Sequence, residues 1–170
     1  MKKLTLLISI LFFTGLLFTS CGPDKKRAVD YNDNIVIEQI NIVNNMQFLF
    51  DTFEEYDSLE MEKAYAKLLK SIEEALFKAK NLEPFDNDET FKNHAIDLFS
   101  EYKNVTENEY RKMIDILLLP DSLYDDQQIA IWDSLNKAGM EKLNNALEKF
   151  NDYQKVFAEK YDISISDSVQ

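Results

Sequence analysis

The chain has 170 residues, a formal net charge of −12 at pH 7 and a single cysteine. This acidic balance argues against nucleic-acid binding, which depends on Lys and Arg placed against phosphate. One cysteine excludes an internal disulfide and a thiolate metal centre. Hydrophobic residues make up 45% of the chain, which predicts a folded protein rather than an acidic disordered one.

The first 20 residues have the order of a secretory signal peptide. Lys2 and Lys3 precede an apolar run from Leu4 to Leu17. That run is shorter than the ~17 residues a stable membrane span needs. We therefore predict that residues 1–20 are removed on export.

The segment Phe18-Thr19-Ser20-Cys21-Gly22 resembles a bacterial lipobox. The resemblance implies cleavage before Cys21 and acylation of its thiol and amine. With two or more acyl chains such an anchor is stable. Residues 21–28 are then the acylated cysteine and a short tether, and the protein is expected in the cell envelope, lipid-anchored at the outer membrane. The alternative is an ordinary signal peptide followed by an unmodified cysteine.

Residues 29–163 have the apolar period of helices. The first helix is predicted from Val29 to Tyr56 on two seven-residue series, which start at Val29 and Ile35. Both series are expected to be buried. Phe48 and Ile37 lie off this stripe and should be partly exposed. Asp57 to Glu60 reads as a capping box that opens a second helix, ending near Asn81.

The third helix is predicted to begin near Asp88, after the breaker Pro84. A polar stretch, residues 103–109, interrupts its apolar face and predicts a bend, a frayed middle or a shift of the buried face. Pro120 ends this segment. The fourth helix is expected to start between Ser122 and Gln127 and to end near Tyr161, with Gly139 as a close approach or a break.

Four helices with short connections predict an all-α fold, an antiparallel up-down four-helix bundle preceded by a cleaved lipoprotein signal peptide. The bundle domain is expected over residues 29–163. Ile163 to Ser166 alternates like a strand but has no partner strand, so residues 164–170 are predicted to be a flexible tail.

The sequence indicates no catalytic residue, no metal ligand set and no cofactor. A carboxylate-bridged di-iron bundle needs two Glu-x-x-His units, whereas this chain has one histidine, His94, preceded at three residues by Phe91. No nucleophile elbow or glycine-rich phosphate loop occurs. Asp86 to Glu89 lacks the glycine and distant Glu of a calcium loop and is better explained as helix capping. The same explanation fits Asp125 and Asp126.

A short pattern, Asp-Ser followed by an aliphatic residue, recurs along the chain. It resembles the acceptor sites of a general O-glycosylation system in some envelope-dwelling Gram-negative bacteria. The candidate sites that the resemblance implies are Ser58, Ser122, Ser134 and Ser168. Asp-Ser is also good cap chemistry, which leaves a purely structural explanation open.

Several core and turn segments stand out in the mature chain: Asp30-Tyr31-Asn32, Leu82-Glu83-Pro84-Phe85, Phe91, Tyr102 and Val156 to Ile163. In these segments the chain resembles a family of uncharacterised four-helix surface lipoproteins of Bacteroidota and spirochaetes. The resemblance covers most of residues 28–163. It implies a fold and a location, and it carries no activity or active-site residue.

These observations favour a non-enzymatic envelope protein, a binding or structural module that uses a helical surface for an unknown protein or glycan partner. Phe48 and Phe77 would be its first contacts. One alternative is a small-molecule or metal-handling bundle, with a pocket formed by Tyr65, Tyr102 and Tyr153. Another is an immunity or inhibitor lipoprotein whose acidic face blocks a basic toxin.

Overall fold

A computed structural model describes residues 25–165, and every regular element in that range is helical. The elements are α1 (Lys25–Glu55), α2 (Ser58–Asn81), α3 (Thr90–Val105), the π-helix η1 (Thr106–Tyr110), α4 (Arg111–Leu117), the 3₁₀-helix η2 (Asp121–Leu123) and α5 (Asp126–Tyr161). Since α3, η1 and α4 follow one another without a gap, they form one rod. The chain is therefore all-α with four long helical segments, as the sequence predicts. None of the described helices is both long and apolar enough to cross a bilayer.

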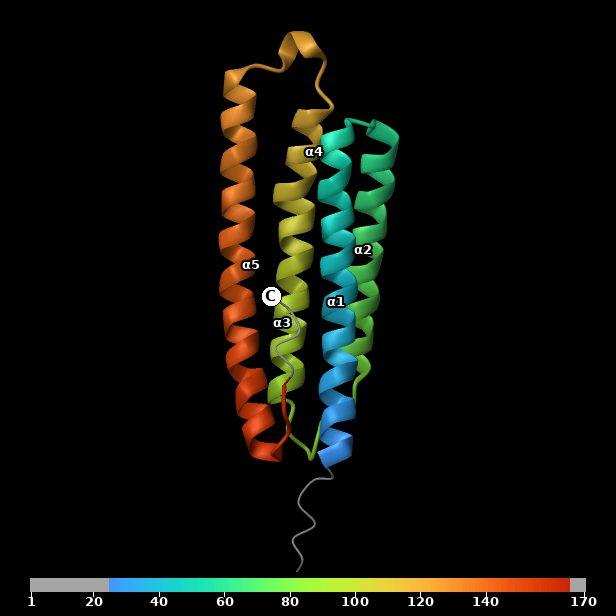
Figure 1. Cartoon of the computed structure of the whole chain (residues 1–170), viewed down its shortest axis with the longest axis vertical. Coiled ribbons are helices and arrows are strands. Elements are labelled where there is room, and N and C mark those ends of the chain that lie inside the picture. Colours follow the sequence, from blue (N-terminus) through green and yellow to red (C-terminus); the bar gives the residue numbers. More distant parts are fainter. Residues whose placement is uncertain (1–24, 166–170) are drawn as a thin grey trace, which may run out of the picture.

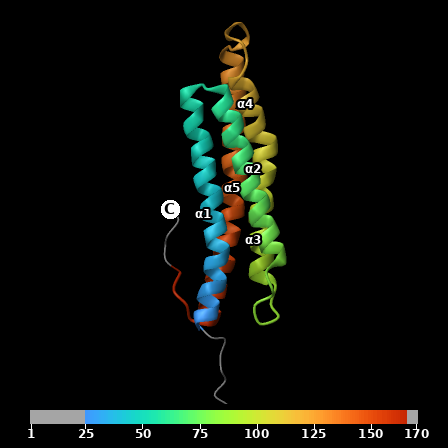
Figure 2. The same ribbon diagram turned by 90° about the vertical axis from the view of Figure 1, so that its right-hand side faces the viewer.

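The four segments lie side by side along one axis, and the chain reverses direction at each connection (Figures 1 and 2). α1 packs along α2, α2 along α3, and α3 along α5. In contrast, α1 and α5 make few mutual contacts. Three sides of the assembly are thus closed by helix packing, and the side between α1 and α5 is not.

α1 begins at Lys25, four residues before the predicted start, so residues 25–28 of the expected tether are helical. Side-chain contacts with other parts of the protein stabilise this first turn of α1. Ala28 is fully buried, Arg27 lies over the ring of Phe85 at 5.4 Å, and Lys25 is paired with Asp162. Alanine and cationic side chains add no large residue to the apolar period, so the sequence pattern did not predict this turn.

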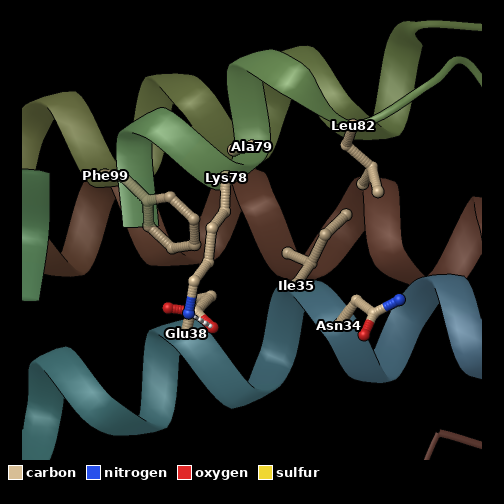
Figure 3. Close-up of a pocket in the computed structure, with 7 residues that line it drawn as sticks. All are labelled: Asn34, Ile35, Glu38, Lys78, Ala79, Leu82 and Phe99. Atoms are coloured by element: carbon tan, nitrogen blue, oxygen red, sulfur yellow. Dashed lines mark hydrogen bonds and ion pairs between the residues drawn. The ribbon is translucent and has the colours of Figure 1, made fainter. Parts of the chain in front are cut away.

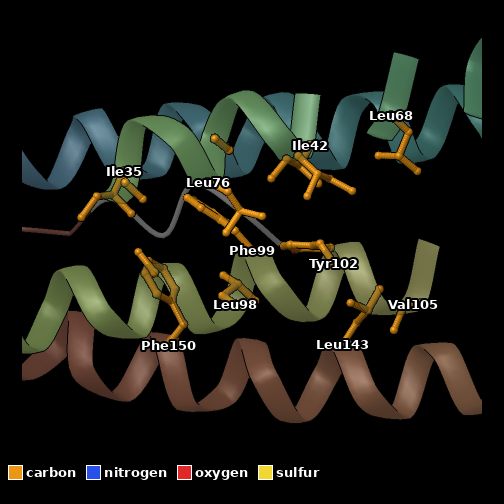
Figure 4. Packing of buried hydrophobic residues seen from close by; sticks show 14 of the residues in the cluster. Ile35, Ile42, Leu68, Leu76, Leu98, Phe99, Tyr102, Val105, Leu143 and Phe150 are labelled. Carbon is orange, nitrogen blue, oxygen red and sulfur yellow. The ribbon is translucent and has the colours of Figure 1, made fainter. Parts of the chain in front are cut away.

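Only one of the two seven-residue series of α1 forms the core. Ile35, Ile42 and Leu49 are at most 2% exposed. Figure 4 shows Ile35 and Ile42 facing side chains of the other helices in the interior. Val29 is 37% exposed and Tyr56 is 65% exposed, so the prediction that both are buried is wrong. Tyr56 lies beyond the helix end in a left-handed conformation, which turns its ring to solvent. Phe48 and Ile37 are exposed, as predicted.

The connections follow from local hydrogen bonding. Asp57 caps α2 by accepting from the amides of Leu59 (2.9 Å) and Glu60 (3.1 Å), but Glu60 pairs with Lys63 instead of reaching back. Half of the predicted capping box therefore forms.

Residues 86–89 were interpreted from the sequence as helix caps, but most of them form the turn between α2 and α3. Asp86 and Asn87 both adopt a positive φ, of 50° and 62°, and Asp88 N donates to Phe85 O at 2.9 Å. Asn and Asp tolerate this conformation better than other side chains. Of residues 86–89, only Asp88 accepts a hydrogen bond from a helix amide, that of Thr90, at 2.9 Å. Asp125 caps α5 as predicted, accepting from Gln127 and Gln128.

An aromatic cluster closes the end of the molecule that carries Lys25. Phe157 on α5 contacts Tyr31 of α1, Phe85 of the α2–α3 turn and Phe91 of α3, with ring centroids 5.7, 5.4 and 4.7 Å away. Tyr161 completes the cluster, 4.8 Å from Phe85. Ring packing of this kind adds about 0.5–1.5 kcal/mol per pair to ordinary burial. This end of the assembly is therefore fixed by side chains from every long segment except α2.

We expect Phe157→Ala to lower the free energy of unfolding by about 3–5 kcal/mol, because it leaves a cavity among four other rings. Its neighbour Val156 is 59% exposed, so Val156→Ala should change the same quantity by no more than about 0.5 kcal/mol. Urea unfolding followed by circular dichroism measures both. Equal losses for the two variants would contradict the cluster.

The pairing of Asp88 with Lys160 predicts a pH-dependent contribution to stability. Asp88 accepts from Lys160 Nζ at 2.8 Å and from Thr90 N, and these bonds hold the pKa of its carboxyl well below the ordinary value of 3.8. A lowered pKa stabilises the folded state above about pH 4, and this contribution is lost as the pH falls below it. Both side chains are about half exposed, so the coupling should not exceed about 1 kcal/mol at pH 7.

A double-mutant cycle with Asp88→Asn and Lys160→Gln measures this coupling. It should be larger at pH 7 than at pH 2, because Asp88 is protonated in the unfolded chain at pH 2 while its lowered pKa keeps it partly ionised in the folded protein. A coupling that is the same at both values would show that the ion pair is not its source.

Candidate functional site: the groove between α1 and α5

The open side between α1 and α5 contains a groove of about 550 Å³. α1 and α5 form its walls, and the α3–η1 rod forms its floor. The lining residues are Gln39, Val43, Met46, Gln47, Phe50, Tyr102, Tyr110, Trp132, Asn136, Met140, Leu143, Asn144 and Leu147. None of them is charged, although 29% of the chain is Asp, Glu, Lys or Arg.

The groove is bounded at both ends by contacts between α1 and α5. Near the Lys25 end, Gln154 donates to Asn32 at 2.8 Å and Tyr31 stacks on Phe157. Towards the other end, Phe53 meets Trp132 edge-on with ring centroids 6.2 Å apart. The site is thus a slot of finite length rather than a seam that runs along the whole molecule.

The α1 wall comes from a segment without a single charge. Residues 39–50 contain no Asp, Glu, Lys or Arg. One face of this segment is core, and the half-buried Val43, Met46 and Phe50 of the adjoining series line the slot. Val43 and Phe50 of the second apolar series therefore line the slot instead of forming a second core face.

The floor depends on the π-helix η1. Tyr102 and Tyr110 are eight residues apart, which is about 2.2 turns of an α-helix and would point them in different directions. A π-turn accommodates one extra residue, so that both rings reach the slot. The polar stretch at residues 103–109 predicted a bend, a frayed middle or a shifted face. The structure instead has the π-helix η1 at residues 106–110, and one buried face continues through it from Tyr102 to Tyr110.

Both tyrosines of the floor stay neutral. Burial raises the pKa of Tyr110 far above its ordinary value. Burial also raises the pKa of Tyr102, against the opposing effect of a hydrogen bond with Gln39. The Tyr110 hydroxyl donates to Met46 Sδ at 3.3 Å. The floor is therefore uncharged and tied to the α1 wall.

Gly139 lets α5 approach the floor closely. A Cβ at this position would lie 3.1 Å from Val105 Cγ1 and 3.4 Å from the ring of Tyr110. The helix continues through Gly139 without a break, so the close-approach alternative is the one the structure supports.

Trp132 carries an unsatisfied polar group. Its indole N–H is buried and has no acceptor among residues 25–165. A buried donor without a partner costs about 1–3 kcal/mol. Such a cost marks this end of the slot as imperfectly packed.

A second, smaller pocket of about 290 Å³ lies between α1 and α2. Figure 3 shows Ile35, Leu82 and Phe99 around it and the ion pair between Lys78 and Glu38 across it. The Lys78–Glu38 distance is 2.7 Å, so the two charged groups near this pocket satisfy one another. It offers less room and no free charge for a ligand.

The opposite side of α5 carries a polar cavity of about 520 Å³ between α3 and α5. The His94 ring stacks on the Tyr153 ring beside this cavity, with ring centroids 3.3 Å apart. His94 Nδ1 lies 3.9 Å from Asp97 Oδ2. Lys142 donates to Glu109 at 2.9 Å. Among residues 25–165, no three His, Cys, Asp or Glu side chains gather where they could hold a metal ion.

The tyrosines proposed as a pocket do not come together. Tyr102 lines the slot, whereas Tyr65 lies beneath Arg111 and Tyr153 beneath His94. Sequence reasoning did not single out Gln39, Tyr110 and Met140 for the site. The missed signal is the uncharged run at 39–50, which is unusual in so acidic a chain.

The candidate glycosylation sites within the described range are all exposed. Ser58 is the first residue of α2, Ser122 lies in η2, and Ser134 lies within α5. The first two belong to connections at the end of the molecule opposite Lys25 (Figure 1). Ser168 and Cys21 lie outside the described residues.

No family model matches the chain, and neither a curated protein nor a solved structure matches it.

We expect Gly139→Leu to lower the free energy of unfolding by about 1–3 kcal/mol, because the added side chain forces α5 away from η1. Ala130 is exposed on the same helix, so Ala130→Leu is the matched control and should be nearly neutral. Thermal unfolding measures both. A neutral or stabilising Gly139→Leu would show that the close approach does not hold α5 in place.

Proposed function

We propose that this protein is a non-enzymatic binding module of the bacterial cell envelope, anchored through an acylated Cys21, whose ligand site is the α1–α5 slot. The observation that carries the proposal is the slot's lining, which is apolar, aromatic and amide-bearing without a charged side chain. Exposed apolar surface is costly in water, and a concentrated patch of it commonly marks a binding site.

The rest of the proposal concerns architecture and location. The mature protein is an antiparallel up-down four-helix bundle released from a cleaved lipoprotein signal peptide, as in the surface lipoproteins it resembles. α1 begins at Lys25, so four residues from Cys21 would span at most about 14 Å. The Lys25 end would then stay close to the outer membrane, and the candidate glycosylation sites Ser58 and Ser122 would face away from it.

Photo-crosslinking in the native host tests the proposal. A photoreactive amino acid replaces Met140, which is 53% exposed at the slot, or Phe77, which is 69% exposed and does not line it. We expect an adduct from the Met140 position and none from Phe77, because the proposed ligand site is the slot and no longer the exposed ring of Phe77 that the sequence suggested. Intact mass of the same membrane-derived protein should show the acyl groups on Cys21 and any sugar on serine.

Cys21→Ala supplies the control for anchoring and should move the protein out of the membrane fraction. An unacylated cysteine in the wild-type protein would refute the anchor. Adducts of equal yield from Met140 and Phe77 would refute the slot as the binding site.

A further inference from the structure

We infer that the slot between α1 and α5 binds one extended hydrocarbon chain of an uncharged lipid-like molecule. The inference rests on the proposed function, since it names the ligand class of the same site. Length, charge and shape of the slot each point to this class.

The length of the slot fits one acyl chain. On α1 the lining runs from Gln39 to Phe50, and on α5 from Trp132 to Leu147. At 1.5 Å per residue these walls are about 16 and 22 Å long. A bilayer's hydrocarbon core is about 30 Å thick, so one chain in one leaflet extends about 15 Å. A chain of that length fits between the two closed ends.

The charge of the slot favours a neutral molecule. No cation lines it that could pair with a carboxylate or phosphate, and its two floor tyrosines remain protonated. The surrounding chain is acidic and would repel an anion. The amides of Gln47, Asn136 and Asn144 at the slot can instead bond to hydroxyl or ester oxygens.

The shape of the slot disfavours a partner helix. A helix lying between α1 and α5 needs about 8–10 Å to each neighbouring axis and must pass beyond the ends of the slot. Here the Asn32–Gln154 bond and the Phe53–Trp132 contact join α1 to α5 at those ends. Met46 and Met140, which line the slot, are flexible and adapt well to a hydrocarbon chain.

Trp132 is a built-in reporter because it is the only tryptophan of the chain. It lies at the end of the slot remote from Lys25, only six residues after the start of α5. A quencher on a bound hydrocarbon chain would therefore reach Trp132, whereas one that remains in a bilayer near Lys25 would not. Its unpaired N–H could also find an acceptor on the ligand after a small rotation of the indole.

The test uses the full chain in phosphatidylcholine nanodiscs and a monoacylglycerol brominated on its acyl chain. We expect saturable quenching of Trp132 fluorescence. Met140→Glu and Leu147→Glu place a carboxylate in the slot and should weaken the apparent affinity at least tenfold. Phe77→Glu adds the same charge away from the slot and should leave it unchanged. Because Met140 is already half exposed, Met140→Glu tests binding without threatening the fold.

Quenching that does not saturate, or that is equal in wild type and Met140→Glu, would overturn the inference. So would tighter binding of the corresponding ionised fatty acid at pH 9. If the Met140 crosslink instead captures a polypeptide in the host, the slot binds but its ligand is not a lipid chain. That outcome overturns this inference and leaves the proposed function standing.

Discussion

The close packing of α5 against the rod of α3, η1 and α4 determines the rest of the structure. Gly139 has no Cβ to hold the two apart, so α5 lies directly on Val105 and Tyr110. In the same way, α1 packs on α2 through the buried series Ile35, Ile42 and Leu49. Because each outer helix packs mainly on its hairpin partner, few contacts remain between α1 and α5, and the slot is the consequence.

The two ends of the slot have different origins. Near Lys25, α1 and α5 meet because the aromatic cluster around Phe157 draws Tyr31, Phe85 and Phe91 into one interior. At the other end only Phe53 and Trp132 meet, and the indole N–H is left without an acceptor. The end near Lys25 is thus tightly packed, whereas the end at Phe53 and Trp132 is closed by a single ring contact.

The two sides of α5 differ in chemistry. Towards α1 the helix presents Asn136, Met140, Leu147 and no charge. Towards α3 it presents Lys142 and Lys149 beside Glu101 and Asp97. On this second side Lys142 pairs with Glu109 at 2.9 Å. The first side exposes apolar surface that water solvates poorly.

The sequence by itself determined the helical class, the number of long segments and most of their bounds, because the 3.6-residue period and the breakers at Pro84 and Pro120 are local signals. It also predicted the exposure of Phe48 and Ile37. Which of the two apolar series of α1 would enter the core was decided by the tertiary structure, since that depends on which neighbour each face meets. The π-turn that aligns Tyr102 with Tyr110, and the slot it floors, were likewise decided by packing across the α3–α5 interface. Periodicity indicates which residues form the apolar face of a helix. The arrangement of the helices determines how many of those residues are buried.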